Sequence, residues 1–261
     1  MAKGINALTG NPDLEPERTK SYEISIKQSF QYDVVASITY FRKETTNQID
    51  TKTFVPGDSK LAGSYGFAEY VNNPFANASG IELVVSRERG DWVTGEISYT
   101  YMNAEGTSGS AEDRFYIAQY GLPPAIRVYP LSWDQRHTFK SLLRVVTPWD
   151  MNLTFVTEWH SGRPYTEYPS STGFERIDGG LFYQNNARMP SYFTGDVKIE
   201  KYFGLDWWSS ARMRIYLDVR NVTDARNVAW VDSNGKVGGE LSDPSGYYVG
   251  RRTNIGVQIE F

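Results

Sequence analysis

The stretch RMRIYLDVR, residues 212–220, decides the fold. Every second residue from Met213 to Val219 is apolar, and the positions between and beside them carry three arginines, a tyrosine and an aspartate. A period of two is the signature of a strand with one apolar and one polar face. Arginine and carboxylate groups facing a dry core would be very costly unless they were paired, whereas facing water they cost little. The stretch therefore predicts a strand with one face toward apolar surroundings and the other face toward water.

About nine stretches of the chain show this alternation, and their connections are alternately short and long. Most have close to the roughly 9 to 11 residues that cross a bilayer at a tilt. Outer-membrane barrels keep short periplasmic turns and long extracellular loops, whereas a soluble sandwich has no physical reason to sort loops in this way. The sequence therefore predicts an all-β fold, an antiparallel transmembrane β-barrel segment. The expected strands cover residues 19–30, 32–42, 78–88, 93–101, 137–146, 152–160, 192–203, 211–221 and 247–261.

The closing stretch keeps its apolar series up to the last residue, with Ile255, Val257, Ile259 and Phe261 on one face. A solvated terminus normally frays, so this pattern predicts a fixed environment for Phe261. Single-chain bacterial barrels have an even number of strands, so about nine strands predict the C-terminal part of a larger barrel.

Aromatic residues gather near the expected strand ends, as interfacial rings do in membrane barrels. Because aromatic residues favour strands in general, a one-sided sheet with a solvated face is the alternative interpretation. The residues are Tyr22, Tyr32, Tyr40, Trp92, Tyr99, Tyr101, Trp149, Trp159, Trp207 and Trp208.

The composition excludes several classes of protein. The chain has 27 Lys plus Arg against 31 Asp plus Glu, so it lacks the surplus of basic residues that would predict nucleic-acid binding. The absence of cysteine excludes disulfides and Cys-ligated zinc within this sequence. No apolar run is long enough for a transmembrane helix, and residues 1–23 do not resemble a secretory signal peptide. Two readings of the start stay open: a cytoplasmic protein, or a missing N-terminal part.

Motifs for catalysis are not found. The sequence has neither G-x-S-x-G nor H-E-x-x-H, and no glycine-rich phosphate loop. His160 shares a strand face with Glu158, a pair that is more often a polar contact than a metal site. We therefore expect no enzyme activity, no cofactor and no metal.

Short segments spread along the chain resemble motifs of TonB-dependent outer-membrane receptors. GNPDLEPERT (residues 10–19) resembles the segment that precedes a barrel strand, and SGRPYT (161–166) resembles the G-x-PYT at the outer end of a strand. NVTDARN (221–227) is similar to the segment after the penultimate strand. GVQIEF (256–261) resembles the terminal assembly signal that ends in phenylalanine.

The resemblance implies a plugged barrel of about 22 strands that imports a scarce, bulky nutrient, namely an iron chelate, cobalamin or a glycan. It places the protein in the outer membrane of a Gram-negative bacterium, with energy supplied through TonB. We assign residues 1–18 to an extracellular loop segment and 19–261 to the C-terminal part of the barrel. The plug domain is absent from the sequence, so we expect a fragment that does not transport alone and would reach TonB through a missing N-terminal part.

The resemblance also suggests functional residues. The terminal series Ile255, Val257, Ile259 and Phe261 would be read by the barrel-assembly machinery, and the apolar face would contact outer-membrane lipid. A ligand would meet arginines and aromatic rings of the long loops, since arginine binds carboxylates and rings stack on sugars or chelates. The candidates are Tyr120, Arg127, Tyr129, Trp133, Arg163, Tyr165, Tyr183 and Trp230.

Two other functions remain open at this stage. A passive porin-like channel would have the same strand pattern but no plug encoded upstream. A soluble β-sandwich binding module would fold in water without detergent.

Overall fold

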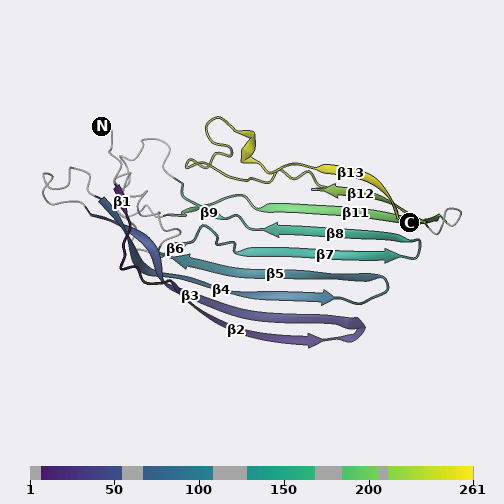
Figure 1. Cartoon of the computed structure of the whole chain (residues 1–261), viewed down its shortest axis with the longest axis horizontal. Helices are drawn as coiled ribbons and strands as arrows, with labels where there is room; N and C mark the ends of the chain where they lie inside the picture. Colours follow the sequence, from purple (N-terminus) through teal and green to yellow (C-terminus); the bar gives the residue numbers. More distant parts are fainter. Residues whose placement is uncertain (1–6, 55–66, 108–127, 168–183, 206–210, 261) are drawn as a thin grey trace.

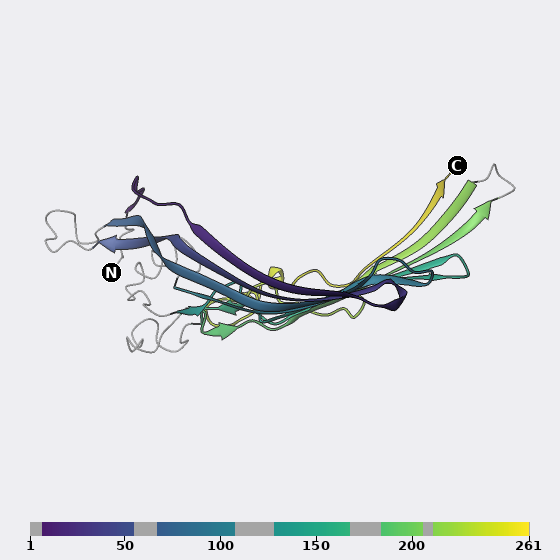
Figure 2. The same cartoon turned by 90° about the horizontal axis from the view of Figure 1, so that it is seen from below.

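Over the residues that the computed structural model describes, 7–54, 67–107, 128–167, 184–205 and 211–260, the chain has no α-helices and folds into a small two-stranded sheet and one large sheet. The large sheet has 11 strands in the order β13-β12-β11-β8-β7-β5-β4-β3-β2, with β1 beside β4 and β6 beside β5. Figure 1 shows the long strands running side by side, with β2 and β13 at the two edges. Figure 2 shows that they form one curved layer.

The long strands of the described residues match the predicted series one for one. They are β2 (Arg18–Ser29), β3 (Val34–Phe54), β4 (Phe67–Arg87), β5 (Val93–Gly106), β7 (His137–Thr147), β8 (Met151–His160), β11 (Tyr192–Leu205), β12 (Ala211–Arg220) and β13 (Arg252–Glu260). The short strands are β1 (Ala7–Thr9), β6 (Tyr129–Pro130), β9 (Pro164–Tyr165) and β10 (Ala187–Arg188).

The connections sort by length at the two ends of the sheet. The short turns 30–33, 88–92 and 148–150 lie at one end, which we call the short-turn end. The connections that carry β6, β9 and β10 lie at the other, the long-loop end (Figure 1). All neighbouring long strands pair antiparallel, so the predicted topology and loop sorting are confirmed.

Two strands are much longer than the sequence predicted, and β5 also continues beyond the predicted 101 to Gly106. We expected strands over 32–42 and 78–88, but β3 and β4 each have 21 residues and pair from Val34↔Arg87 to Phe54↔Phe67. The prediction failed because residues 43–54 are mostly polar, and we took them for a loop. Outside a bilayer a hairpin does not need an apolar face, since ladder hydrogen bonds and β-favouring threonines are sufficient.

The closing strand is shorter than predicted. It begins at Arg252 rather than Tyr247, because residues 247–251 bond to the preceding loop instead. The Tyr248 backbone N–H donates to the Asn227 carbonyl at 2.9 Å, and the Arg251 N–H donates to Asp224 Oδ1 at 2.8 Å.

One face of the sheet is apolar from edge to edge. The register brings Ile199 of β11 opposite Leu217 of β12, and Leu217 opposite Ile255 of β13. Similar rows cross the remaining strands, so every long strand contributes to this apolar face. Its members include Ile24, Ile26, Ile38, Tyr40, Ile81, Leu83, Ile97, Tyr99, Phe139, Leu143, Leu153, Phe155, Val197, Ile215, Val257 and Ile259.

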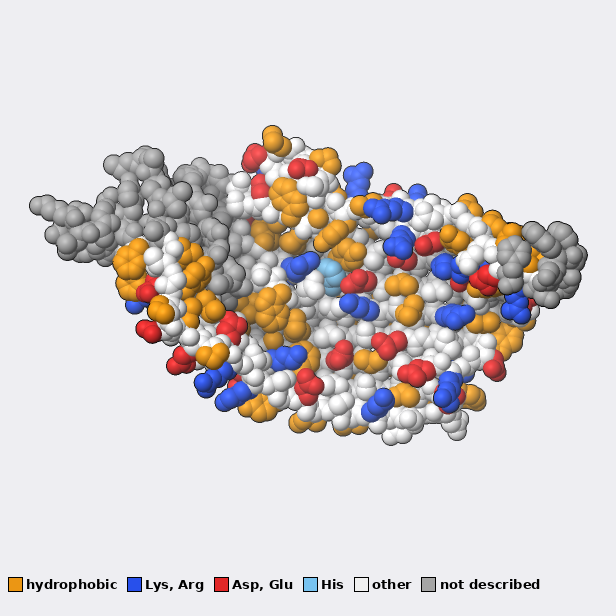
Figure 3. All heavy atoms as spheres, viewed as in Figure 1, with side chains coloured by type: hydrophobic (Ala, Val, Ile, Leu, Met, Phe, Trp, Pro, Cys, Tyr) orange, Lys and Arg blue, Asp and Glu red, His pale blue; other side chains and the backbone are white. Residues whose placement is uncertain are grey.

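The opposite, polar face carries ion pairs. Glu200 on β11 accepts from Lys198 and from Arg214 of β12, each at 2.9 Å, and it is 8% exposed. Lys140 and Glu158 approach to 3.5 Å across β7 and β8. Figure 3 shows charged side chains of both signs spread over the strands on the face in view. Within the polar row predicted from residues 212–220, Arg214 is thus paired with a partner on a neighbouring strand, and Arg220 lies 3.8 Å from Asp218 of its own strand.

The described residues build no second layer over the apolar face, and many of its large side chains are exposed, including Ile24, Ile26, Ile255 and Val257. A water-soluble sandwich buries such a face against a second sheet. The single layer therefore excludes the sandwich alternative for this part of the chain. No helix in the described ranges is long and apolar enough to span a membrane.

Candidate functional site

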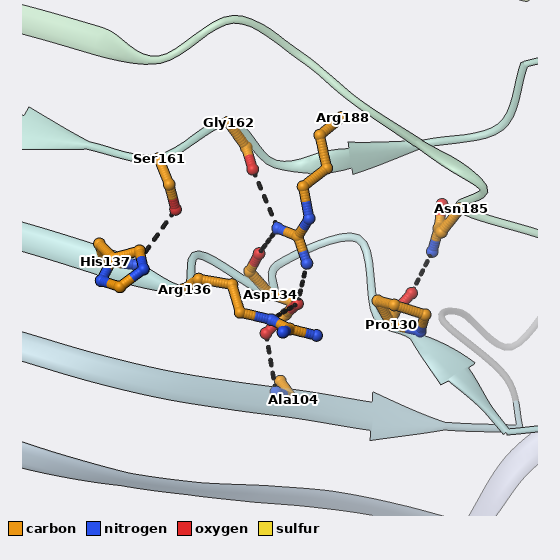
Figure 4. A network of polar contacts seen from close by, with 9 residues as sticks. All are labelled: Ala104, Pro130, Asp134, Arg136, His137, Ser161, Gly162, Asn185 and Arg188. Carbon is orange, nitrogen blue, oxygen red and sulfur yellow. Dashed lines mark hydrogen bonds and ion pairs between the residues drawn. The ribbon is translucent and has the colours of Figure 1, made fainter.

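The long-loop end is built around the carboxylate of Asp134, which is completely buried. Asp134 Oδ1 accepts from the Ala104 backbone N–H of β5 at 2.8 Å, and Oδ2 accepts from Arg136 Nε at 3.2 Å. The Arg188 guanidinium of β10 also donates to Oδ2. Figure 4 shows the two arginines converging on this one carboxylate. The charge is therefore fully compensated, as a buried carboxylate requires.

Arg188 joins two loop segments that are far apart in sequence. Its Nη1 donates to the Asp134 carbonyl at 2.9 Å and to the Gly162 carbonyl at 3.1 Å. Asn185 adds a second link, since its Nδ2 donates to the Pro130 carbonyl at 2.7 Å (Figure 4). The segments around Pro130, Gly162 and Arg188 thus form one hydrogen-bonded unit.

Gly162 lies where the SGRPYT segment meets the strand β10. A Cβ built on it would lie 1.6 Å from the Met189 carbonyl oxygen, so no other residue fits without moving the backbone. The next residue pair, Arg163 and Met189, forms a backbone hydrogen bond of 2.9 Å. Close backbone approach is thus the physical reason for glycine in this motif.

Tyr165 extends the unit toward the loop that precedes β13. A Cβ on Gly235 would lie 2.8 Å from the Tyr165 hydroxyl, so the ring lies against that loop. Burial raises the pKa of the Tyr165 hydroxyl above its usual value, and the negative charge of Glu167 acts in the same direction. The hydroxyl therefore remains a protonated donor, and it points to Glu167 Oε2 at 3.5 Å.

The NVTDARN segment, which follows β12, is hydrogen-bonded to β11. Asn221 has the left-handed φ of 51°, and Asp196 Oδ1 accepts from its backbone N–H at 2.8 Å. Asn227 binds the Phe193 backbone from both sides, since its Oδ1 accepts from the N–H at 2.8 Å and its Nδ2 donates to the carbonyl at 2.6 Å. The asparagines and the aspartate of this segment are thus structural caps of the loop.

The segment GNPDLEPERT packs beside the extended hairpin of β3 and β4. Asn11 Nδ2 donates to the Tyr70 carbonyl at 2.9 Å, and Asn72 Oδ1 accepts from the Glu15 N–H at 2.7 Å. Upstream, β1 pairs in parallel with β4 from Ala7 to Thr9. These contacts place residues 7–17 at the long-loop end.

The structure describes five of the eight predicted ligand residues. Arg163, Trp133 and Trp230 are exposed, Tyr165 is half-buried, and Tyr129 is 2% exposed. Trp230 Nε1 donates to Ser245 Oγ at 3.2 Å. The hydrogen-bonded unit brings Tyr129, Trp133 and Arg163 into the same region, and Tyr165 adjoins the loop that carries Trp230. Tyr120, Arg127 and Tyr183 lie outside the described residues, as do Phe261, Trp207 and Trp208.

Sequence reasoning missed a group of rings on the polar face near the long-loop end. His160 stacks on Tyr192 with ring centroids 4.7 Å apart, and Tyr248 meets Tyr192 edge-on at 5.6 Å. Gln135 Nε2 lies 2.9 Å from His160 Nδ1. Tyr192 directly opposes His160 in the register, a pairing that the predicted antiparallel order of these strands could have revealed. This group offers flat surfaces and polar edges toward the interior.

The described residues contain no group of three or more His, Cys, Asp and Glu side chains that could hold a metal ion.

His137, the other histidine, lies on the apolar face between aromatic rings, with Nδ1 2.8 Å from the Tyr99 hydroxyl. Exposed Trp92 and Trp149 lie near the turns at the opposite end. The rings at the two ends thus have the placement of interfacial aromatic belts.

Known proteins share both the sequence pattern and the fold. Residues 2–222 match the family described as TonB dependent receptor-like, beta-barrel. The iron-regulated outer membrane virulence protein of Vibrio cholerae is 32% identical over 138 residues, which cover 51% of this chain and 21% of that protein. The chain thus spans about a fifth of the length of the curated relatives it matches.

Solved structures are similar in fold. The outer membrane transporter YddB from Escherichia coli has a TM-score of 0.69 and 14% identity, over 98% of this chain and 34% of that chain. The pyoverdine outer membrane receptor FpvA from Pseudomonas aeruginosa has a TM-score of 0.61 and 14% identity, over 95% and 30%. A ferric enterobactin receptor mutant from the same species has a TM-score of 0.57 and 21% identity, over 97% and 32%.

The family match covers most of the sequence, and the solved structures are similar to the chain in fold. The chain therefore belongs to the TonB-dependent receptor-like β-barrel family.

Proposed function

We propose that this chain forms a section of barrel wall and the outer loops of a receptor that imports a bulky nutrient across the outer membrane. The observation that carries the proposal is the hydrogen-bonded unit at the long-loop end, which presents exposed Arg163 and Trp133 beside a polar wall. In a receptor of this family, these loops would meet the ligand before it enters the barrel. The proposal gives the chain no catalytic step.

Among the predicted nutrients we favour an iron chelate over cobalamin or a glycan. The support is the iron-regulated Vibrio relative and the likeness in fold to receptors for ferric enterobactin and pyoverdine. A cationic guanidinium such as that of Arg163 would complement an anionic chelate.

The proposed partners follow from the two faces of the sheet and from the two ends of the chain. The apolar face would contact lipid, and residues 1–18 would lie outside the cell. The terminal series Ile255, Val257, Ile259 and Phe261 would be read by the barrel-assembly machinery. TonB would be reached through a part of the receptor that lies outside this sequence.

Iron uptake by cells that produce the receptor containing this chain tests the proposal. We expect a radioactive ferric chelate to enter the cells, and we expect a proton uncoupler to abolish its entry but not its surface binding. A passive porin-like channel would instead continue to admit the chelate after uncoupling. The absence of both binding and uptake over a panel of ferric chelates would contradict the proposal.

Arg163 is the side chain whose loss should affect binding most directly. The Arg163→Ala variant is expected to raise the Kd of the ferric chelate about tenfold or more, since a charge-assisted hydrogen bond contributes about 1.5–3 kcal/mol. Arg89→Ala is the control, because Arg89 is an exposed arginine at the short-turn end. Equal Kd values for Arg163→Ala and the unchanged receptor would remove Arg163 from the site.

A further inference from the structure

The buried carboxylate of Asp134 has more partners than it needs to hold its own loop in place. Asp134 already has a local cation, since Arg136 is two residues away and donates to Oδ2 at 3.2 Å. The backbone N–H of Ala104, from β5, is a second partner that does not involve β10. These local contacts would hold the carboxylate against the end of the sheet without any help from β10.

Arg188 is the distant partner, 54 residues along the chain. Its guanidinium binds Asp134 Oδ2, the Asp134 carbonyl and the Gly162 carbonyl, so a single side chain joins the two loop segments (Figure 4). Its side chain is 34% exposed, whereas the carboxylate it binds has no exposure. The strongest contact between the segments is therefore a charge-assisted one, shielded from water on the side of the carboxylate.

Two of the exposed ligand candidates flank this contact directly. Trp133 immediately precedes Asp134, and Arg163 immediately follows Gly162. Any change in the Asp134 to Arg188 contact would therefore change the spacing of Trp133 and Arg163. A flexible binding surface loses conformational entropy when the ligand orders it. A spacing that is already fixed before binding avoids this cost and therefore raises affinity.

We propose that Asp134 and Arg188 are positioning residues, which hold the two loop segments as one rigid ligand-contact surface. This inference rests on the proposed function, because it assigns the ligand contacts to those segments. It concerns two side chains that need not touch the ligand at all.

A double-mutant cycle in the receptor containing this chain tests the inference. The variants are Asp134→Asn, Arg188→Gln and the two combined, with ferric enterobactin as the binding probe. We expect each single change to weaken probe binding about tenfold, and we expect the loss in the double change to be clearly smaller than the two losses combined, since the two changes share the Asp134 to Arg188 contact. Asp218→Asn is the control, because its carboxylate pairs with Arg220 at 3.8 Å on the wall of the sheet.

Amide hydrogen exchange supplies a second readout that needs no ligand. Residues 128–136 and 184–189 are expected to exchange about tenfold faster in Asp134→Asn, while β7 and β8 keep their protection. Additive losses of affinity, or unchanged exchange in these segments, would overturn the inference. If the unchanged receptor binds neither ferric enterobactin nor any other chelate of the panel, the proposed ligand class fails, and the exchange data alone decide whether Asp134 holds the loops together.

Discussion

Replacing Ile255 with arginine is expected to prevent most of the receptor from assembling, whereas arginine at the neighbouring position, Asn254→Arg, is expected to be tolerated. Ile255 opposes Leu217 on the apolar face, and Asn254 opposes Asp218 on the polar face. An arginine that faces lipid near the middle of a bilayer costs about 2–4 kcal/mol. An arginine at position 254 would instead face water and the carboxylate of Asp218.

The two variants are matched, because they lie side by side on one strand and introduce the same residue. The measurement is the fraction of folded barrel in the outer membrane, followed by its heat-dependent mobility in gels. Equal assembly of the two variants would mean that the apolar face of β13 does not contact lipid.

The second large effect is expected from Gly162→Ala. The new Cβ would lie 1.6 Å from the Met189 carbonyl oxygen, so the backbone of one segment must move. Overpacking of this kind typically costs about 1–3 kcal/mol, and here it also displaces the carbonyl that accepts from Arg188. We expect the loops to loosen and ligand binding to fall, while the sheet itself still assembles.

Gly10→Ala is the matched control for this change. No atom lies within 4 Å of a Cβ built on Gly10, so the same addition of a methyl group should have little effect. Limited proteolysis of the assembled receptor measures the result, with new cleavage expected within residues 161–167 or 184–191 of Gly162→Ala alone. Identical cleavage of the two variants would show that the close approach at Gly162 does not hold the loop.

The alternation of residues was sufficient to predict the strands and their faces. In residues 212–220 it identified both rows correctly, because a strand that separates lipid from water must alternate. The same criterion failed for residues 43–54, where β3 continues beyond the apolar band and no alternation is required. The apolar part of the strands was thus predictable, but the full length of the hairpin was not.

The site was harder to predict than the sheet. The SGRPYT and NVTDARN segments marked places where the loops are held by specific contacts. These contacts are the close backbone approach at Gly162 and the hydrogen bonds of the Asn227 side chain. Asp134 and Arg188 carry no local signal, since their contact joins residues 54 positions apart, with β7, β8 and β9 between them. Tyr129 was chosen as an aromatic of a long loop, but residue type alone does not reveal that its ring is buried.

The central claim is that one face of this sheet contacts lipid and the other faces the water-filled or plugged interior. The most direct test uses nitroxide labels on cysteines introduced one at a time at residues 153–158 of β8 in the reconstituted receptor. The claim predicts that labels at 153, 155 and 157 collide with lipid-soluble oxygen, whereas labels at 154, 156 and 158 collide with a water-soluble nickel chelate. This includes Thr157 on the lipid face and Val156 on the interior face, against their residue types. Accessibility without a period of two, or with the opposite phase, would contradict the claim.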